Sequence, residues 1–226
     1  MKFSTLAFIS SASLAICSLA SADMTGTVYA STSVISADDG SFGSAFNGTV
    51  VDLWMEFDSN DDVLLNVFDF NLNDANLGRD FYQSGTGSTW TASTNGDIFT
   101  TDALLYADSF VSIGGGPLDS NGTSLDPNGD PNSSNSGWYN SNPNNPNGQV
   151  VSTDVTNTGL GVFIGRFSIN GLDYPGDVLD LTGTSGWATY NQGLGTEGVQ
   201  MNFTVVPAPG AIALLGLATM AGRRRR

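Results

Sequence analysis

Apolar and polar residues alternate with a period of two along several short stretches of the chain, which is typical of half-buried strands. The clearest stretch places apolar residues at Val51, Leu53, Met55 and Phe57, with Asp52, Trp54 and Glu56 between them. Asp58–Asp62 then has the composition of a turn, and Val63–Leu72 that of a returning strand with apolar residues on both faces. The pair predicts a β-hairpin whose second strand is the more deeply buried.

Other stretches extend this pattern. Strands are expected over residues 25–35, 159–170 and 198–206, near Trp187, and over 104–113, where a short helix is the alternative. In the last strand, one face is shared by Val199, Met201, Phe203 and Val205. Many short strands with Gly, Asn and Asp turns between them predict an all-β fold, a single β-sandwich of jelly-roll-like type spanning residues 23–206.

The segment Gly114–Gln149 breaks the pattern. It is rich in Asn, Pro, Gly and Ser, has no periodicity, and is longer than an ordinary connection. Long loops of this kind are either functional or disordered. Because Trp138 and Tyr139 are unusual in a disordered polar stretch, we expect this patch to be held against the domain or used for binding.

The first 22 residues have the features of a secretory signal peptide. Lys2 supplies the positive charge, residues 6–20 are small and apolar, and the residues Ala20 and Ala22 fit an A-x-A cleavage site. The mature chain would then begin at Asp23. The single cysteine, Cys17, lies in this leader, so the exported chain would contain no disulfide.

Residues 207–226 form a second candidate processing segment. The turn Pro207, Ala208, Pro209 and Gly210 precedes an uncharged run over residues 211–222, which is followed by Arg223, Arg224, Arg225 and Arg226. A helix of this length spans about 18 Å, whereas a hydrocarbon core of about 30 Å needs roughly twenty residues. The run is therefore short for a permanent membrane span, and the arginines would hold the tail on the cytoplasmic side.

This order of proline motif, apolar run and arginine cluster resembles the PEP-CTERM sorting signal, with Ala208 standing where that family's motif has Glu. The resemblance implies an exosortase-type processing enzyme as partner. It also implies that the chain is anchored transiently through this segment, loses it, and is delivered to the cell surface or extracellular matrix. The resemblance covers about the last twenty residues and implies no activity. An ordinary tail anchor or a buried apolar strand is the alternative.

Charge narrows the choice of partners. Residues 23–206 contain all 22 carboxylates of the chain, two arginines (Arg79 and Arg166), no lysine and no histidine, a formal charge of about −20. An excess of negative charge of this size repels nucleic acid and anionic membrane surfaces. We therefore expect no nucleic-acid partner.

Composition also excludes most catalytic chemistry. Without histidine, and with no cysteine after the leader, neither a Ser-His-Asp nor a Cys-His arrangement can form, and zinc cannot be bound through histidine. A pair of carboxylates, as in glycosidases, stays open as an alternative. However, only Glu56 and Glu197 are glutamates, and most aspartates lie in turn contexts. We therefore expect no catalytic residues.

Two other kinds of site are suggested by spacing and residue type. Asp126, Asn128 and Asp130 place oxygen ligands at alternate positions, as calcium prefers, although no EF-hand is completed and a solvated turn is the alternative. Exposed aromatic rings flanked by Asn and Asp are suited to stacking on sugars. The candidates for this are Trp54, on the polar face of its strand, and Trp138 and Tyr139 in the long loop, with core packing as the alternative.

These observations predict a non-catalytic exported surface or matrix protein with a structural or adhesive role and extracellular polysaccharide as a partner. The alternatives are a carbohydrate-active enzyme that uses paired carboxylates and a calcium-stabilised surface protein.

Overall fold

The computed structural model describes residues 24–38, 45–83, 90–91, 107–114, 122–141, 147–193 and 195–209. These residues form ten strands. They are β1 (Met24–Asp38), β2 (Ala45–Glu56), β3 (Val63–Asn71), β4 (Phe110–Val111), β5 (Thr123–Leu125), β6 (Trp138–Asn140), β7 (Val151–Ser152), β8 (Leu160–Asn170), β9 (Ser185–Asn191) and β10 (Gly198–Pro207).

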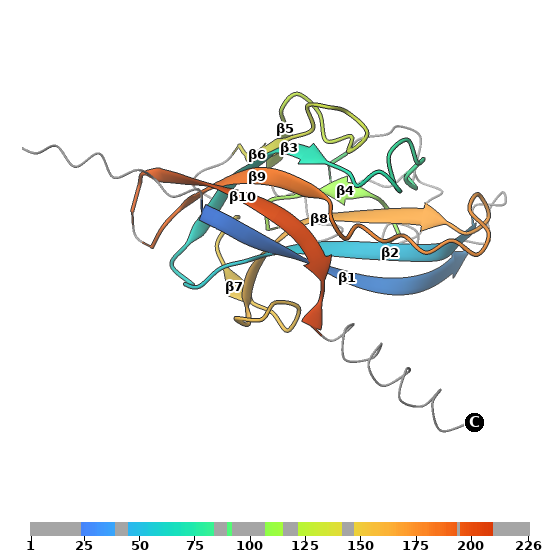
Figure 1. Cartoon of the computed structure of the whole chain (residues 1–226), viewed down its shortest axis with the longest axis horizontal. Helices are drawn as coiled ribbons and strands as arrows, with labels where there is room; N and C mark the ends of the chain where they lie inside the picture. The colour runs from blue at the N-terminus through green and yellow to red at the C-terminus, as the bar shows by residue number, and fades with distance from the viewer. Residues whose placement is uncertain are drawn as a thin grey trace, which may run out of the picture.

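The strands belong to one mixed sheet with the order β4-β8-β2-β1-β10-β9-β3-β6-β5, and β7 pairs with β8 (Figure 1). The first and last strands, β1 and β10, are neighbours in the middle of this order and run parallel, from Met24 opposite Met201 to Ala30 opposite Pro207. The other strand pairs are antiparallel.

The two ends of the sheet curl toward each other and nearly close it. Beyond β4, the amide of Ile113 donates to Thr123 Oγ1 at the start of β5, at 3.0 Å. Near the start of β3, the amide of Leu64 donates to the carbonyl of Gly148 at 2.7 Å. A Cβ at Gly148 would lie 2.1 Å from the Leu64 carbonyl oxygen, and its φ is +82°, so this approach requires glycine. The prediction of a single all-β domain of the sandwich class is confirmed.

The core lies between the walls of the rolled sheet. Phe70 of β3 stacks on Phe167 of β8, with ring centroids 5.5 Å apart. From β10, Met201, Phe203 and Val205 are buried, and Val199 packs against the same cluster, which confirms the predicted shared face.

The strands predicted over 25–35, 159–170 and 198–206 and near Trp187 are confirmed as β1, β8, β10 and β9. Of 104–113, the structure describes residues 107–113 and has a strand only at Phe110–Val111.

The predicted hairpin between β2 and β3 is wrong. Both edges of β2 are paired, with β1 and β8, and three strands separate β2 from β3 in the sheet. The turn Asp58–Asp62 therefore crosses the end of the roll to the opposite wall. Asp62 is buried there, and its Oδ1 accepts the amide of Gly193, which follows β9, at 2.7 Å.

Both candidate processing segments fall largely outside the described residues, including Ala20, Ala22, Gly210 and Arg223–Arg226. Pro207 is the last residue of β10, and the amide of the buried Ala208 donates to the carbonyl of Ala30 at 2.9 Å. The motif that resembles a sorting signal thus begins on the sheet itself. Among the residues described, no helix is long and apolar enough to cross a membrane.

Candidate functional site

Trp138 is a core residue, and the prediction that it is an exposed sugar-stacking side chain is wrong. Its side chain is 1% exposed, its ring lies 5.5 Å from that of Phe70, and its Nε1 donates to the carbonyl of Ser112 at 2.9 Å. The long segment contributes β5 and β6, and β6 pairs with β3. Because side chains alternate along a strand, this pairing turns Trp138 inward and Tyr139 outward.

Tyr139 is the exposed member of the pair, with 40% of its surface accessible. It lies opposite Asn66 of β3 on one side and Ser124 of β5 on the other. Beside it is a groove of about 550 Å³, lined by Leu65, Asn66, Val67, Phe68, Asp126, Trp138, Tyr139 and Asn140. Of the two residues in the loop patch, Trp138 is therefore the one held against the domain, and Tyr139 is the one accessible to a ligand.

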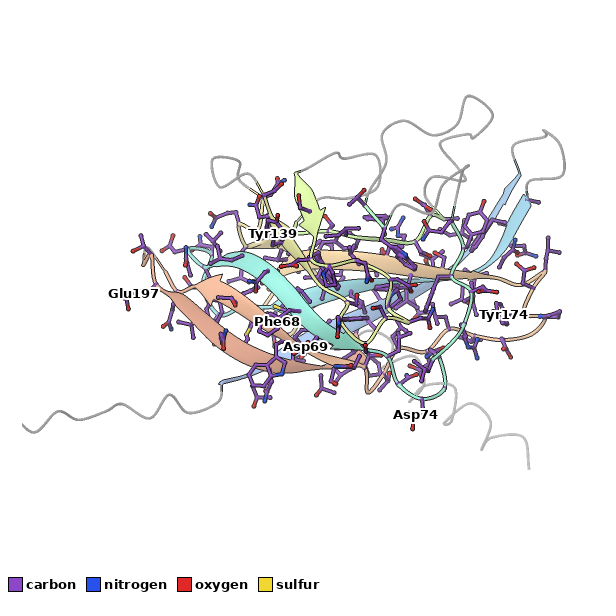
Figure 2. All side chains as sticks on the ribbon, turned by 90° about the horizontal axis from the view of Figure 1, so that it is seen from above. Phe68, Asp69, Asp74, Tyr139, Tyr174 and Glu197 are labelled. Carbon is purple, nitrogen blue, oxygen red and sulfur yellow. The ribbon has the colours of Figure 1, made fainter. Side chains whose placement is uncertain are left out.

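Two further aromatic residues extend this surface. Phe68 of β3 lies opposite Trp187 of β9, and the two rings are nearly parallel, with an angle of 18° and centroids 6.4 Å apart. Their neighbours Val67 and Ala188 are buried, so Phe68 and Trp187 face outward, and both are half-buried. We call Phe68, Tyr139 and Trp187 together the outer aromatic face. Figure 2 shows Phe68 and Tyr139 in the same part of the molecule, between Glu197 at one end and Tyr174 at the other.

Uncharged polar side chains continue the two cross-strand rows of this face. The row of Phe68 and Trp187 continues through Asn202 to Thr25. The row of Tyr139 consists of Ser124, Tyr139, Asn66, Thr189 and Gln200. Flat apolar rings bordered by amides and hydroxyls can bind a ligand that has an apolar ring face and a hydroxyl-bearing edge.

Sequence reasoning missed Phe68 and Trp187 as surface residues. The signal was present, because Val63–Leu72 has apolar residues on both faces. That pattern predicts the more deeply buried strand of a hairpin. In the structure, one face of β3 packs into the core through Leu64, Val67 and Phe70, and the other carries Phe68 on the outer wall.

Trp54 lies on the outer face of β2, as the alternation of apolar and polar residues along that strand predicted. It lies away from Phe68, Tyr139 and Trp187, which belong to β3, β6 and β9. It is half-buried, opposite Tyr29, and its ring packs edge-on against Phe163 with centroids 5.5 Å apart. The strands β1 and β10 separate β2 from β9. Trp54 is therefore not part of the outer aromatic face.

Two of the candidate calcium ligands, Asn128 and Asp130, accept hydrogen bonds from backbone amides of their own loop. Asn128 Oδ1 accepts the amide of Asp130 at 3.0 Å, and Asp130 Oδ1 accepts the amide of Asn132 at 2.9 Å. Asp126 is exposed. In the described part of the chain, no group of three or more acidic side chains is placed to hold a metal ion. Calcium binding here stays a prediction.

A second cleft lies at the end of the roll near the turn that follows β2. It has a volume of about 350 Å³, and Glu56, Asp58, Asp62 and Tyr190 are among its lining residues. Glu56 Oε1 accepts the amide of Thr158 at 2.8 Å, and Asp62 caps Gly193 as described above. Two of the three carboxylates therefore hold turns in place.

The tyrosines near this cleft predict a loss of stability at alkaline pH. Burial, followed by the charges of Asp62 and Asp58, raises the pKa of Tyr190, and burial, followed by Glu56, raises the pKa of Tyr29. Above the usual tyrosine pKa of about 10, the unfolded chain loses these protons before the folded chain does. The free energy of unfolding should therefore fall as pH rises above about 10 and be unaffected by these groups below it.

Urea unfolding at a series of pH values from about 8 to 11 measures this effect. Tyr190→Phe is expected to flatten the decline, because one of the two shifted groups is removed. A decline of the same slope in the variant would show that Tyr190 does not contribute.

Comparison with protein-family models, with curated proteins and with solved structures finds no match to this chain.

Proposed function

We propose that this chain is a non-catalytic exported surface or matrix protein that binds extracellular polysaccharide through the outer aromatic face. The observation that carries the proposal is the outward placement of three aromatic rings: Phe68 and Tyr139 line one groove, and Trp187 lies against Phe68. A sugar ring offers an apolar C–H face for stacking and hydroxyls at its edge for hydrogen bonds. Aromatic walls with a few polar groups are the usual composition of small-ligand sites.

Export rests on the two ends of the sequence. The leader over residues 1–22 and the segment 207–226 that resembles a PEP-CTERM sorting signal support a chain that is secreted and then processed by an exosortase-type enzyme. Because β10 ends at Pro207, the sorting segment would follow the sheet without a linker. The domain would then remain close to the membrane until processing released it.

The carbohydrate-active enzyme is the alternative. The cleft with Glu56, Asp58 and Asp62 is a place where such an enzyme could use paired carboxylates. In our proposal Glu56 and Asp62 are structural and hold the turns described above. Release of reducing sugar from a bound polysaccharide, abolished by Asp62→Asn, would favour the enzyme instead.

Co-sedimentation with polysaccharide from the producing culture tests the proposal. The full chain is kept soluble in a polyoxyethylene detergent, which carries no sugar group that could compete. The wild-type chain is expected to sediment with the polysaccharide in a saturable manner. Tyr139→Ala should bind several-fold more weakly, because it removes one exposed ring from the groove. No binding by the wild-type chain, or equal binding by the variant, would overturn the assignment of the site.

A further inference from the structure

We infer that the outer aromatic face binds uncharged polysaccharide chains and discriminates against anionic ones. This inference rests on the proposed function and names the chemical class of its ligand. The first observation is the composition of the face. The chain has 22 carboxylates, yet none of them occurs in the two cross-strand rows that contain Phe68, Tyr139 and Trp187. The rows offer amides and hydroxyls, which match sugar hydroxyls as donors and acceptors.

The second observation concerns cations, which an anionic polymer would need. Between the leader and the tail the sequence has only two, Arg79 and Arg166. Arg166 makes a two-pronged ion pair with Asp52, with contacts of 2.6 Å and 2.8 Å. Arg79 Nη1 lies 3.3 Å from Asp177 Oδ2, and its guanidinium lies over the ring of Tyr174. Both arginines are thus engaged with carboxylates, and neither lines the groove.

The third observation is the negative charge around the face. Asp126 lines the groove, and the exposed Asp69 directly follows Phe68. Residues 23–206 carry a formal charge of about −20 in total. Repulsion between exposed charges extends over about 10 Å at 0.1 M salt, so carboxylates on a polymer lying across the groove would be repelled. An uncharged chain would not experience this repulsion.

Affinity electrophoresis of the full chain, under the detergent conditions given above, tests the inference with two pairs of polymers. One pair is the neutral and the acidic fraction of the producing culture's polysaccharide, separated on an anion exchanger. The other is hydroxyethylcellulose and carboxymethylcellulose, which share a backbone and differ in charge. At about 0.1 M salt, retardation by the neutral member of at least one pair is expected to exceed that by its acidic partner about tenfold or more.

The outcomes distinguish failure of polysaccharide binding from failure of the preference for uncharged chains. Equal or stronger retardation by the acidic polymers would overturn the inference and leave polysaccharide binding in place. No retardation by any of the four polymers would overturn both. If the acidic polymer binds only at high salt, where charge repulsion is screened, the inference is supported.

Asp126→Asn provides a second test that does not depend on the choice of backbone. Removing the carboxylate from the groove is expected to strengthen binding of the acidic polymer several-fold relative to binding of the neutral one. Asp154→Asn is the matched control. It removes the same charge from an exposed turn between β7 and β8, and β8 lies in the opposite wall. Equal effects of the two variants on the acidic polymer would overturn the role of charge at the groove.

Discussion

Trp138→Ala is expected to lower the free energy of unfolding by about 3–5 kcal/mol, the usual cost of removing a large buried aromatic side chain. The indole fills the space beside Phe70 and donates to the carbonyl of Ser112, so the substitution leaves a cavity and removes a buried hydrogen bond. It would also weaken closure of the sheet, because Ser112 follows β4 and Trp138 belongs to β6. Urea unfolding followed by circular dichroism measures the loss.

The adjacent Tyr139→Ala is the matched control for this prediction. Its side chain faces outward, so the free energy of unfolding is expected to change by only about 0.5 kcal/mol. If the two variants were equally stable, Trp138 would not be a core residue and the inward and outward assignments of β6 would be incorrect. For the same reason, a binding test must not remove both residues together, since loss of binding would then reflect unfolding.

Trp187→Ala is expected to weaken polysaccharide binding by about 2 kcal/mol, or roughly 30-fold, as is usual for a binding residue that dominates its interface. The indole provides the larger of the two stacked rings on the face, and its loss also leaves Phe68 without its neighbour. Trp187→Phe keeps a flat ring and should retain most of the affinity. Binding isotherms with the neutral polysaccharide fraction measure both variants.

Trp54→Ala controls for the general loss of a half-buried tryptophan from the outer side of the sheet. Because Trp54 packs against Phe163 on β8 and is separated from β9 by two strands, the variant is expected to bind as the wild-type chain does. If Trp54→Ala abolished binding and Trp187→Ala did not, the binding surface would be the one near Tyr29 and Trp54.

Much of the fold follows from local pattern. The positions and inward faces of β2 and β10 could be predicted because burial of every second side chain leaves a direct trace in the sequence. For β8, which is buried on both faces, only the position of the strand could be predicted. The choice of partner strands leaves no such trace. The turn Asp58–Asp62 is as suitable for a hairpin as for a connection between walls. One edge of β2 pairs with the preceding strand β1, and the other pairs with β8, which is far away in the sequence.

The candidate site was predicted only in part, for a related reason. The three residues of β6 are too few to show a period, so nothing in the sequence tells which of Trp138 and Tyr139 faces the core. Phe68 and Trp187 are 119 positions apart and meet only because β3 pairs with β9. A surface assembled from several strands cannot be recognised until their register is known.

Hydroxyl-radical footprinting of the full chain, with and without the neutral polysaccharide, tests the central claim most directly, because it reports the accessibility of individual aromatic side chains. Our account predicts that the polysaccharide slows oxidation of Phe68, Tyr139 and Trp187. Trp54 and Tyr174, which lie outside the outer aromatic face, should slow only to the extent that the sugar consumes radicals, and their rates provide the correction for the other three residues. Protection of Trp54 instead, or equal slowing of all five residues, would contradict the assignment of the binding surface.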